Sequence, residues 1–235
     1  MTHIYLPVIN YFSSTDFMIP VITIPMIDFL LCTLFTSQAR WFQLHSAINA
    51  IIVYIISNDV FLLYTDPLNN IHETESKLEC SFIVLLHIYH YLLFKNTMMD
   101  YFHHIVFIGF GCIPIFCFYN TNLIRLASFA GCGLPGAIEY FTLSLVKHKK
   151  LNSLTQKRLN SYMYNYFRFP ATVYSISIIH IAYIMNLTPA AHIALVYYII
   201  FIVFLNGSFY NKLTLDNHTE HKILLKINNS NTKKN

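Results

Sequence analysis

Two adjacent histidines, His103 and His104, begin a strongly apolar run in the stretch MMDYFHHIVF, residues 98–107. Asp100 lies three and four residues before them, so its carboxylate can reach His104 across one helical turn. A carboxylate in contact with a histidine selects the tautomer of the ring and supports it as a base or nucleophile. The structural alternative is that Asp100 caps a helix, because a carboxylate there accepts hydrogen bonds from free backbone N–H groups.

Other polar side chains also lie inside apolar stretches, where an ionisable group is costly and marks a functional candidate. The catalytic candidates are His103, His104 and Asp100, and the candidates for lipid or substrate binding are His45, His87, His90, Glu139 and Arg168. Structural alternatives stay open for them. A lone intramembrane histidine such as His45 can hydrogen-bond a neighbouring helix, and Glu139 can form an ion pair with Arg168.

The composition indicates a membrane protein. Of its 235 residues 55% are hydrophobic and 11% are charged, whereas a soluble domain is roughly 25% charged. The basic residues lie mostly in short connections and in the tail, without a dense stripe on one face, which argues against nucleic acid as a partner. The five cysteines form no CxxC pair and no zinc-type spacing with histidine, so we predict no metal site and no cofactor.

Seven apolar segments are candidates to cross a bilayer, for which a helix needs about 20 residues. They cover residues 17–37, 42–64, 80–95, 100–119, 121–146, 163–185 and 190–210. The third segment is short and the fifth follows closely on the fourth, so six spans or a re-entrant segment stay open as alternatives. The sequence therefore predicts an all-α polytopic membrane protein with about seven transmembrane helices.

The charges between these segments predict the orientation, because connections rich in Lys and Arg stay in the cytosol. The connection after the fifth segment is basic and the one after the second is acidic. With seven spans, residues 1–16 are lumenal, residues 17–210 form the transmembrane domain, and residues 211–235 form a polar, frayed cytosolic tail. The candidate side chains then lie at a similar depth in several helices, which predicts one cavity that opens to the cytosol.

The fifth segment contains the stretch SFAGCGLPGAIEY, residues 128–140. Its glycines allow a neighbouring helix to approach closely. Pro135 has no N–H, so the carbonyl of Gly131 loses its helical partner. We expect a kink or an unwound turn here, either as a plain structural feature or as part of a cavity wall. Cys80 and Cys117 both fall near the lumenal face, where a disulfide depends on their separation.

Four stretches give the chain a resemblance to a known family: RWFQLHSAINA at 40–50, MDYFHHIVF at 99–107, CGLPGAIEYFTLSLVK at 132–147 and LNSYMYNYFRFP at 159–170. In their order and spacing they resemble the TLC-domain (TRAM–LAG1–CLN8) family over residues 25–210. The double histidine at the head of a helix is the most specific of them. The resemblance implies a protein of the endoplasmic reticulum membrane, built as a six-helix barrel with one extra helix.

The chain is similar to short TLC-domain proteins and more distantly to ceramide synthases, which join the acyl group of acyl-CoA to the amine of a sphingoid base. This implies catalytic roles for His103 and His104, with membrane lipid, acyl-CoA and a sphingoid base as partners. Arg168 and the basic connection 147–158 would then attract the phosphates of the coenzyme.

Several functions in lipid metabolism or membrane lipid homeostasis stay open. The helix after the paired histidines carries Glu139 as its one carboxylate, where ceramide synthases carry two aspartates. One reading is an acyltransferase of the ceramide synthase type, and the other is a non-enzymatic protein that binds lipid or escorts cargo. A third, a di-iron lipid hydroxylase or desaturase, needs about eight histidines in HxxxH and HxxHH spacings, which do not occur here at this depth.

Overall fold

The computed structural model describes residues 14–119, 121–188 and 192–232. Residues 1–13 of the predicted lumenal segment lie outside the described residues. The described chain consists of helices and has no strand. The elements are α2 (Thr15–Phe35), η1 (Ser37–Ala39), α3 (Arg40–Thr65), α4 (Leu78–Leu93), α5 (Met98–Phe102), η2 (His103–Cys112), α6 (Ile113–Phe118), α7 (Leu123–Ser128), η3 (Phe129–Gly133), α8 (Leu134–Lys147), α9 (Ser153–Met163), η4 (Tyr164–Arg168), α10 (Phe169–Ile184) and α11 (Ile193–Thr232).

Six continuous helical segments of the described chain are long and apolar enough to cross a membrane: Thr15–Phe35, Ser37–Thr65, Met98–Phe118, Leu123–Lys147, Ser153–Ile184 and Ile193–Ile227. The apolar helix α4 has 16 residues and is about 24 Å long, which is less than the bilayer's hydrocarbon core of about 30 Å. Large apolar side chains such as Phe29 and Leu34 are exposed on the outer surface. The helical content and these six long apolar segments confirm the prediction of an all-α polytopic membrane protein.

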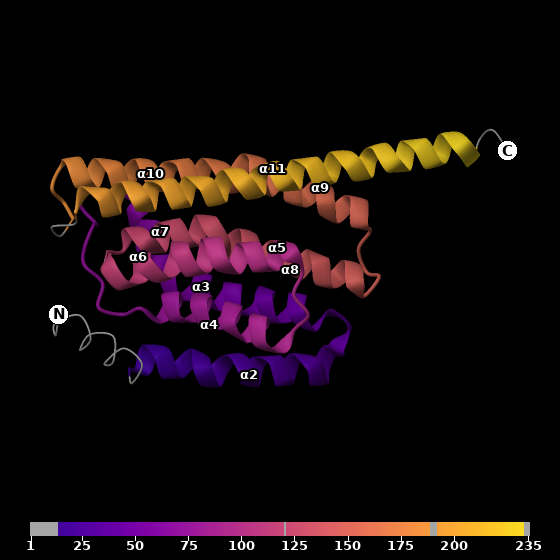
Figure 1. Cartoon of the computed structure of the whole chain (residues 1–235), viewed down its shortest axis with the longest axis horizontal. Helices are drawn as coiled ribbons and strands as arrows, with labels where there is room; N and C mark the ends of the chain where they lie inside the picture. Colours follow the sequence, from indigo (N-terminus) through magenta and orange to yellow (C-terminus); the bar gives the residue numbers. More distant parts are fainter. Residues whose placement is uncertain (1–13, 120, 189–191, 233–235) are drawn as a thin grey trace.

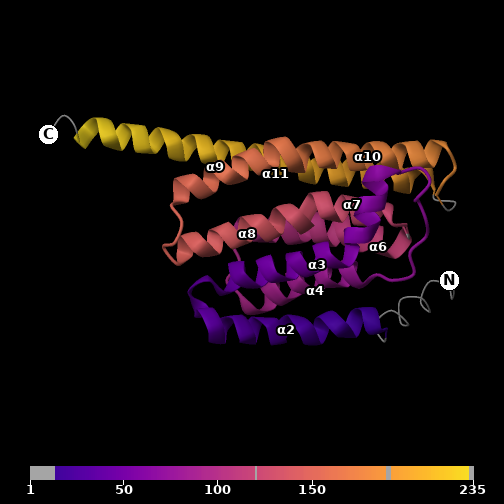
Figure 2. The same cartoon turned by 180° about the vertical axis from the view of Figure 1, so that it is seen from behind.

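The helices run back and forth along one axis (Figure 1). Helix α2 packs on the outside of α3 and α4. The other helices contact one another in a closed circuit, from α3 to α4, to η2, to α11, to α9 and α10, to α7 and α8, and back to α3. Figure 2 shows that the α8–α9 connection and the α3–α4 connection lie at opposite ends of this bundle.

Helix α3 supplies the centre of the apolar core. It buries a row of side chains at helical spacing: Leu44, Ile48, Ile52, Ile56 and Leu63. Helix α8 lies close beside it, because Gly136 has no side chain to hold the two helices apart. A Cβ added at Gly136 would lie 2.4 Å from Nδ2 of Asn49. The close approach that the glycines of residues 128–140 predict is therefore present at this position.

Three helical segments of the described chain, η2, η3 and η4, are π-helical turns. The N–H of the residue that follows each turn donates a hydrogen bond to the carbonyl five residues earlier, for example from Leu134 to Phe129. Each turn ends two residues before a proline: Pro114, Pro135 and Pro170. A proline ring crowds the carbonyl four residues before it and donates no hydrogen bond, so a wider turn relieves the crowding. The sequence predicted a disturbed turn at Pro135 alone, and the helix widens at all three prolines.

The expectation of a frayed tail after residue 210 is wrong, because α11 continues as one helix of 40 residues. Its continuation packs against α9, and Lys157 of α9 donates a hydrogen bond to the side chain of Asn217. Residues 153–158 are likewise helical and not part of a loop. Asn152 caps α9 by accepting a hydrogen bond from the Leu154 N–H at 2.8 Å.

Candidate functional site

A cavity of about 320 Å³ lies between the helices of the bundle, and its lining includes Gln156 and Lys157 in the first turns of α9. The candidate residues all line it: His103, His104, Asp100, His45, His87, His90, Glu139 and Arg168. They come from α3, α4, α5, η2, α8 and η4. The structure therefore brings the whole set together around one space, and their roles in binding or catalysis stay predictions.

A chain of hydrogen bonds runs through two of the histidines. Nδ1 of His87 lies 2.6 Å from the carbonyl of Ile83, Nε2 of His103 lies 2.9 Å from Nε2 of His87, and the Tyr210 hydroxyl lies 2.6 Å from Nδ1 of His103. A carbonyl only accepts, so His87 must donate from Nδ1 and accept at Nε2 when it is neutral. His103 then donates from Nε2, and Tyr210 donates to His103. Both ring nitrogens of neutral His103 are thus occupied.

His104, unlike His103, has a ring nitrogen without a hydrogen-bond partner among the described residues. Its Nδ1 is buried and has no hydrogen-bond partner in the described part of the chain. The ring lies edge-on to the rings of His90 and His87, with centroids 5.1 Å and 5.6 Å away. Of the two neighbouring histidines, His104 is therefore the one with a nitrogen available to a ligand.

Asp100 caps the N-terminus of α5, which is the structural role that the sequence left open for it. Its Oδ2 accepts hydrogen bonds from the backbone N–H and the hydroxyl of Thr97, both at 2.7 Å. Thr97 in turn accepts from the Asp100 N–H, so the two residues form a capping box at the start of α5. No hydrogen bond joins Asp100 to His104 among the described residues. The Thr-x-x-Asp spacing is a sequence signal for this cap, but Thr97 was not among the residues predicted from the sequence.

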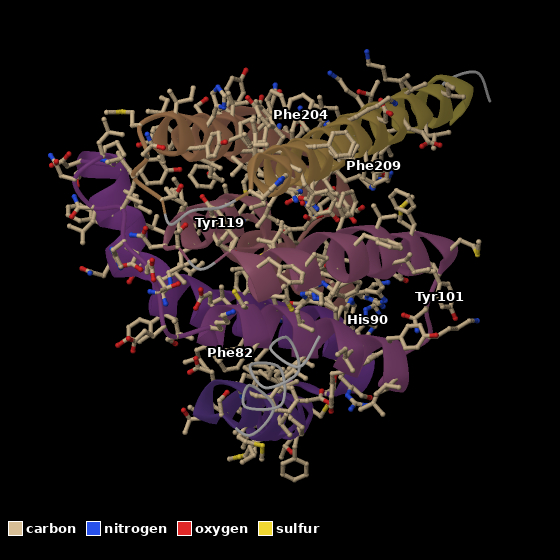
Figure 3. The ribbon with its side chains drawn as sticks, turned by 60° about the vertical axis from the view of Figure 1, so that its left-hand side comes forward. Phe82, His90, Tyr101, Tyr119, Phe204 and Phe209 are labelled. Carbon is tan, nitrogen blue, oxygen red and sulfur yellow. The ribbon has the colours of Figure 1, made fainter. Side chains whose placement is uncertain are left out.

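Aromatic rings form the wall beside the histidines. Trp41 stacks on His90 with ring centroids 3.6 Å apart, and its edge meets His45 at 3.9 Å. His45 also stacks on Tyr140 at 4.2 Å. Figure 3 shows His90 beside a group of side-chain nitrogens between the α3–α4 layer and the α5–α6 segment. Trp41 and Tyr140 were not predicted as site residues, although Trp41 lies one helical turn before His45, a spacing that brings two rings together.

Glu139 and Arg168 do not form the ion pair that their sequence left open as a structural alternative. Glu139 accepts a hydrogen bond from the hydroxyl of Tyr164. Arg168 donates from Nη2 to the carbonyl of Gly131 at 2.6 Å and to the side chain of Asn206 at 2.8 Å. The Gly131 carbonyl is the one that Pro135 leaves without a helical donor, so Arg168 replaces the missing backbone N–H.

A second, smaller cavity of about 120 Å³ adjoins the first. Much of its lining is apolar: Phe107, Ile108, Ile115, Phe116, Ile124 and Ile202. His87, His103 and Arg168 line both cavities. A polar chamber and an apolar chamber therefore meet at these side chains.

No group of three or more His, Cys, Asp or Glu side chains in the described ranges is arranged to hold a metal ion. Cys80 and Cys117 are free thiols, so no disulfide joins them. Comparisons with models of protein families, with curated proteins and with solved structures give no match. The resemblance to TLC-domain proteins and the location in the endoplasmic reticulum thus stay predictions.

Proposed function

We propose that this chain is a lipid-handling membrane protein of the TLC type, whose ligand occupies the two adjoining cavities. The observation that carries the proposal is that the two cavities adjoin, since His87, His103 and Arg168 line both the polar and the apolar chamber. An amphiphilic molecule needs both environments. Its chain gains from leaving water for apolar surface, and its polar group needs hydrogen-bond partners once it is buried.

The same proposal includes the finer features of the fold. The closed circuit of helices with α2 outside supports a six-helix barrel with one extra helix, and α4 counts as the seventh span because it closes the circuit between α3 and η2. The basic residues around the α8–α9 connection support a cytosolic opening and a cytosolic C-terminus. Membrane lipid homeostasis in the endoplasmic reticulum is the role that we assign to such a protein.

Lipid binding is testable on the purified protein in a non-ionic detergent, with a long-chain lipid that carries a fluorescent group. Ala127 lines the apolar cavity, so Ala127→Phe fills part of it, and we expect binding to weaken about tenfold or more. Ala194 is exposed on α11, and Ala194→Phe is the matched control with unchanged binding. A wild-type protein that binds no lipid would sink the proposal.

Transfer of an acyl group to an amine is a second candidate, and the unpartnered Nδ1 of His104 favours it. In this reaction the amine nitrogen attacks the thioester carbonyl of acyl-CoA and loses its proton to His104. A C–N bond forms, the C–S bond breaks, and the thiolate of the coenzyme leaves and takes up a proton. A positioned base of this kind contributes about 10²–10⁴ to the rate.

The enzymatic candidate is tested with labelled acyl-CoA and a panel of sphingoid bases, with mass spectrometry to detect the amide. We expect His104→Ala to abolish product. His103→Ala should only reduce it, because both ring nitrogens of His103 are already hydrogen-bonded to His87 and Tyr210. If the folded protein binds lipid but forms no amide, the non-enzymatic function remains and the synthase candidate is rejected.

A further inference from the structure

Arg168 is a buried cation without an anionic partner. Only 4% of the residue is exposed. Its partners are neutral: the Gly131 carbonyl and the Asn206 amide oxygen accept from Nη2, and the rings of Tyr164 and Tyr210 lie 4.5 Å and 5.0 Å from the guanidinium carbon. No carboxylate of the described residues forms an ion pair with it. A buried charge of this kind is costly unless it is paired.

The rest of the guanidinium group is available to a ligand. Nε is buried without a hydrogen-bond partner, and no described group accepts a hydrogen bond from Nη1. Three N–H bonds of Arg168 therefore lack an acceptor at the place where the polar and the apolar cavity meet. A single guanidinium N–H forms a strong, charge-assisted hydrogen bond with an oxygen of a carboxylate or a phosphate.

The other arginines packed between helices differ in this respect. Arg125 donates to Asp59 at 2.5 Å and to Glu79 at 3.2 Å, and Arg40 pairs with Asp28. Both cations are therefore neutralised by carboxylates of the chain itself. Among these three buried or partly buried arginines, Arg168 alone has no carboxylate partner in the described chain, and it lies on a cavity wall.

We propose that the ligand of this cavity carries an oxyanion, a carboxylate or a phosphate, which pairs with Arg168, and an apolar chain that extends into the smaller cavity. The inference rests on the proposed lipid-binding function and names its ligand class, a single-chain acidic amphiphile. A single chain suits the modest volume of the apolar cavity. Glu139 lines the same polar cavity but forms no ion pair with Arg168, and its carboxylate accepts a hydrogen bond from the Tyr164 hydroxyl.

The first test compares head groups on one chain in the wild-type protein. Binding of palmitate, hexadecyl phosphate, hexadecanol and hexadecylamine is measured by competition in a non-ionic detergent. We expect one or both anionic probes to bind about tenfold more tightly than the alcohol, or better, with the amine weakest. The tighter of the two anionic probes identifies the oxyanion as a carboxylate or a phosphate. Equal affinities, or a preference for the alcohol or the amine, would overturn the inference.

The second test assigns the preference to Arg168. Arg168→Gln should reduce binding of the anionic probe to the level of hexadecanol and leave hexadecanol binding unchanged, and Arg168→Lys should keep part of the preference. Arg125→Gln is the matched control, which should lower stability without changing the preference. An anionic preference that survives in Arg168→Gln rejects the assignment. Where that variant fails to fold, the wild-type comparison and Arg168→Lys decide.

The outcomes separate this inference from the proposed function. If hexadecanol binds and the anionic probes bind no better, the protein handles lipid but Arg168 does not select an oxyanion. If none of the four probes binds, the lipid-binding function fails and this inference fails with it.

Discussion

His103 and His104 are neighbours in sequence, but their ring nitrogens differ in hydrogen bonding. His103 is held between Tyr210 and His87, whereas Nδ1 of His104 has no partner within the described residues. His103, in the middle of the hydrogen-bond chain, orients the wall of the cavity, whereas Nδ1 of His104 is available to a ligand. We therefore expect variants of His104 to change chemistry or ligand binding more than variants of His103.

The hydrogen-bond chain itself is testable at Tyr210. Tyr210→Phe removes the hydroxyl that donates to Nδ1 of His103 and should lower the free energy of unfolding by about 1 kcal/mol. Tyr162 is 57% exposed, and its hydroxyl has no hydrogen-bond partner in the described chain. Tyr162→Phe should therefore have almost no effect. Denaturant unfolding in detergent compares the two variants, and equal losses would contradict the proposed network.

At the scale of the elements, the π-helical turns connect the prolines to the cavity. His103 and His104 lie in η2, Gly131 lies in η3, and Arg168 lies in η4. Each of these residues lines the cavity, in agreement with the frequent occurrence of π turns at functional sites. Proline alone does not produce such a turn, because α2 contains Pro20 and Pro25 and stays α-helical throughout.

The packing of α11 on α10 depends on Gly207. A Cβ there would lie 2.7 Å from Cγ2 of Thr172, and the hydroxyl of Thr172 is held by the Arg168 carbonyl at 2.8 Å. Gly207→Ala should therefore cost about 1–3 kcal/mol of stability through overpacking. Gly109→Ala is the control, because an added Cβ there meets only its own helix at 3.5 Å. Thermal unfolding in detergent measures both, and a neutral Gly207→Ala would show that the helices can separate at little cost.

Helix α2 is attached to the ring through Asp28. The carboxylate of Asp28 accepts hydrogen bonds from Nε of Arg40 at 2.8 Å and from the hydroxyl of Tyr89 at 2.7 Å. Asp28→Asn removes the counter-charge of a partly exposed arginine, so we expect a loss of about 1–3 kcal/mol and faster proteolysis at the α2–α3 connection. Asp216→Asn breaks an exposed pair with Lys212 and should cost less than about 0.5 kcal/mol. Similar losses in the two variants would contradict this role of Asp28.

At the scale of the whole molecule, the two ends of the bundle should face different compartments. Glu75 lies in the α3–α4 connection at one end and Lys150 lies in the α8–α9 connection at the other, and both side chains are exposed. In sealed vesicles with the cytosolic face outward, an impermeant maleimide should label Lys150→Cys directly. It should label Glu75→Cys only after the membrane is permeabilised.

The background for this experiment replaces Cys117, which is exposed, by alanine. Direct labelling of both positions would contradict a spanning α4 and favour a re-entrant segment. Labelling of Glu75→Cys alone would show that the cavity opens to the lumenal side, against the proposed orientation.

The sequence by itself determined the helical class and the set of residues that meet inside the bundle. An ionisable side chain is costly in lipid, so a polar residue in an apolar segment turns inward. For that reason His45, His87, Glu139 and Arg168 were predictable from their surroundings in the sequence, and the structure brings them to one cavity. The freed carbonyl of Gly131 was predictable as well, because proline chemistry depends on local covalent structure.

Only the tertiary structure decided which of these groups contact one another. Spacing allowed Asp100 to reach either His104 or the start of its own helix, and the folded chain uses it for the cap. The partners of Arg168 and His103 on α11, Asn206 and Tyr210, lie far away in the sequence. Such contacts depend on the rotation and register of packed helices. A rotation of one residue moves a side chain by about 100° around the helix, and local sequence patterns do not specify that angle for two distant helices.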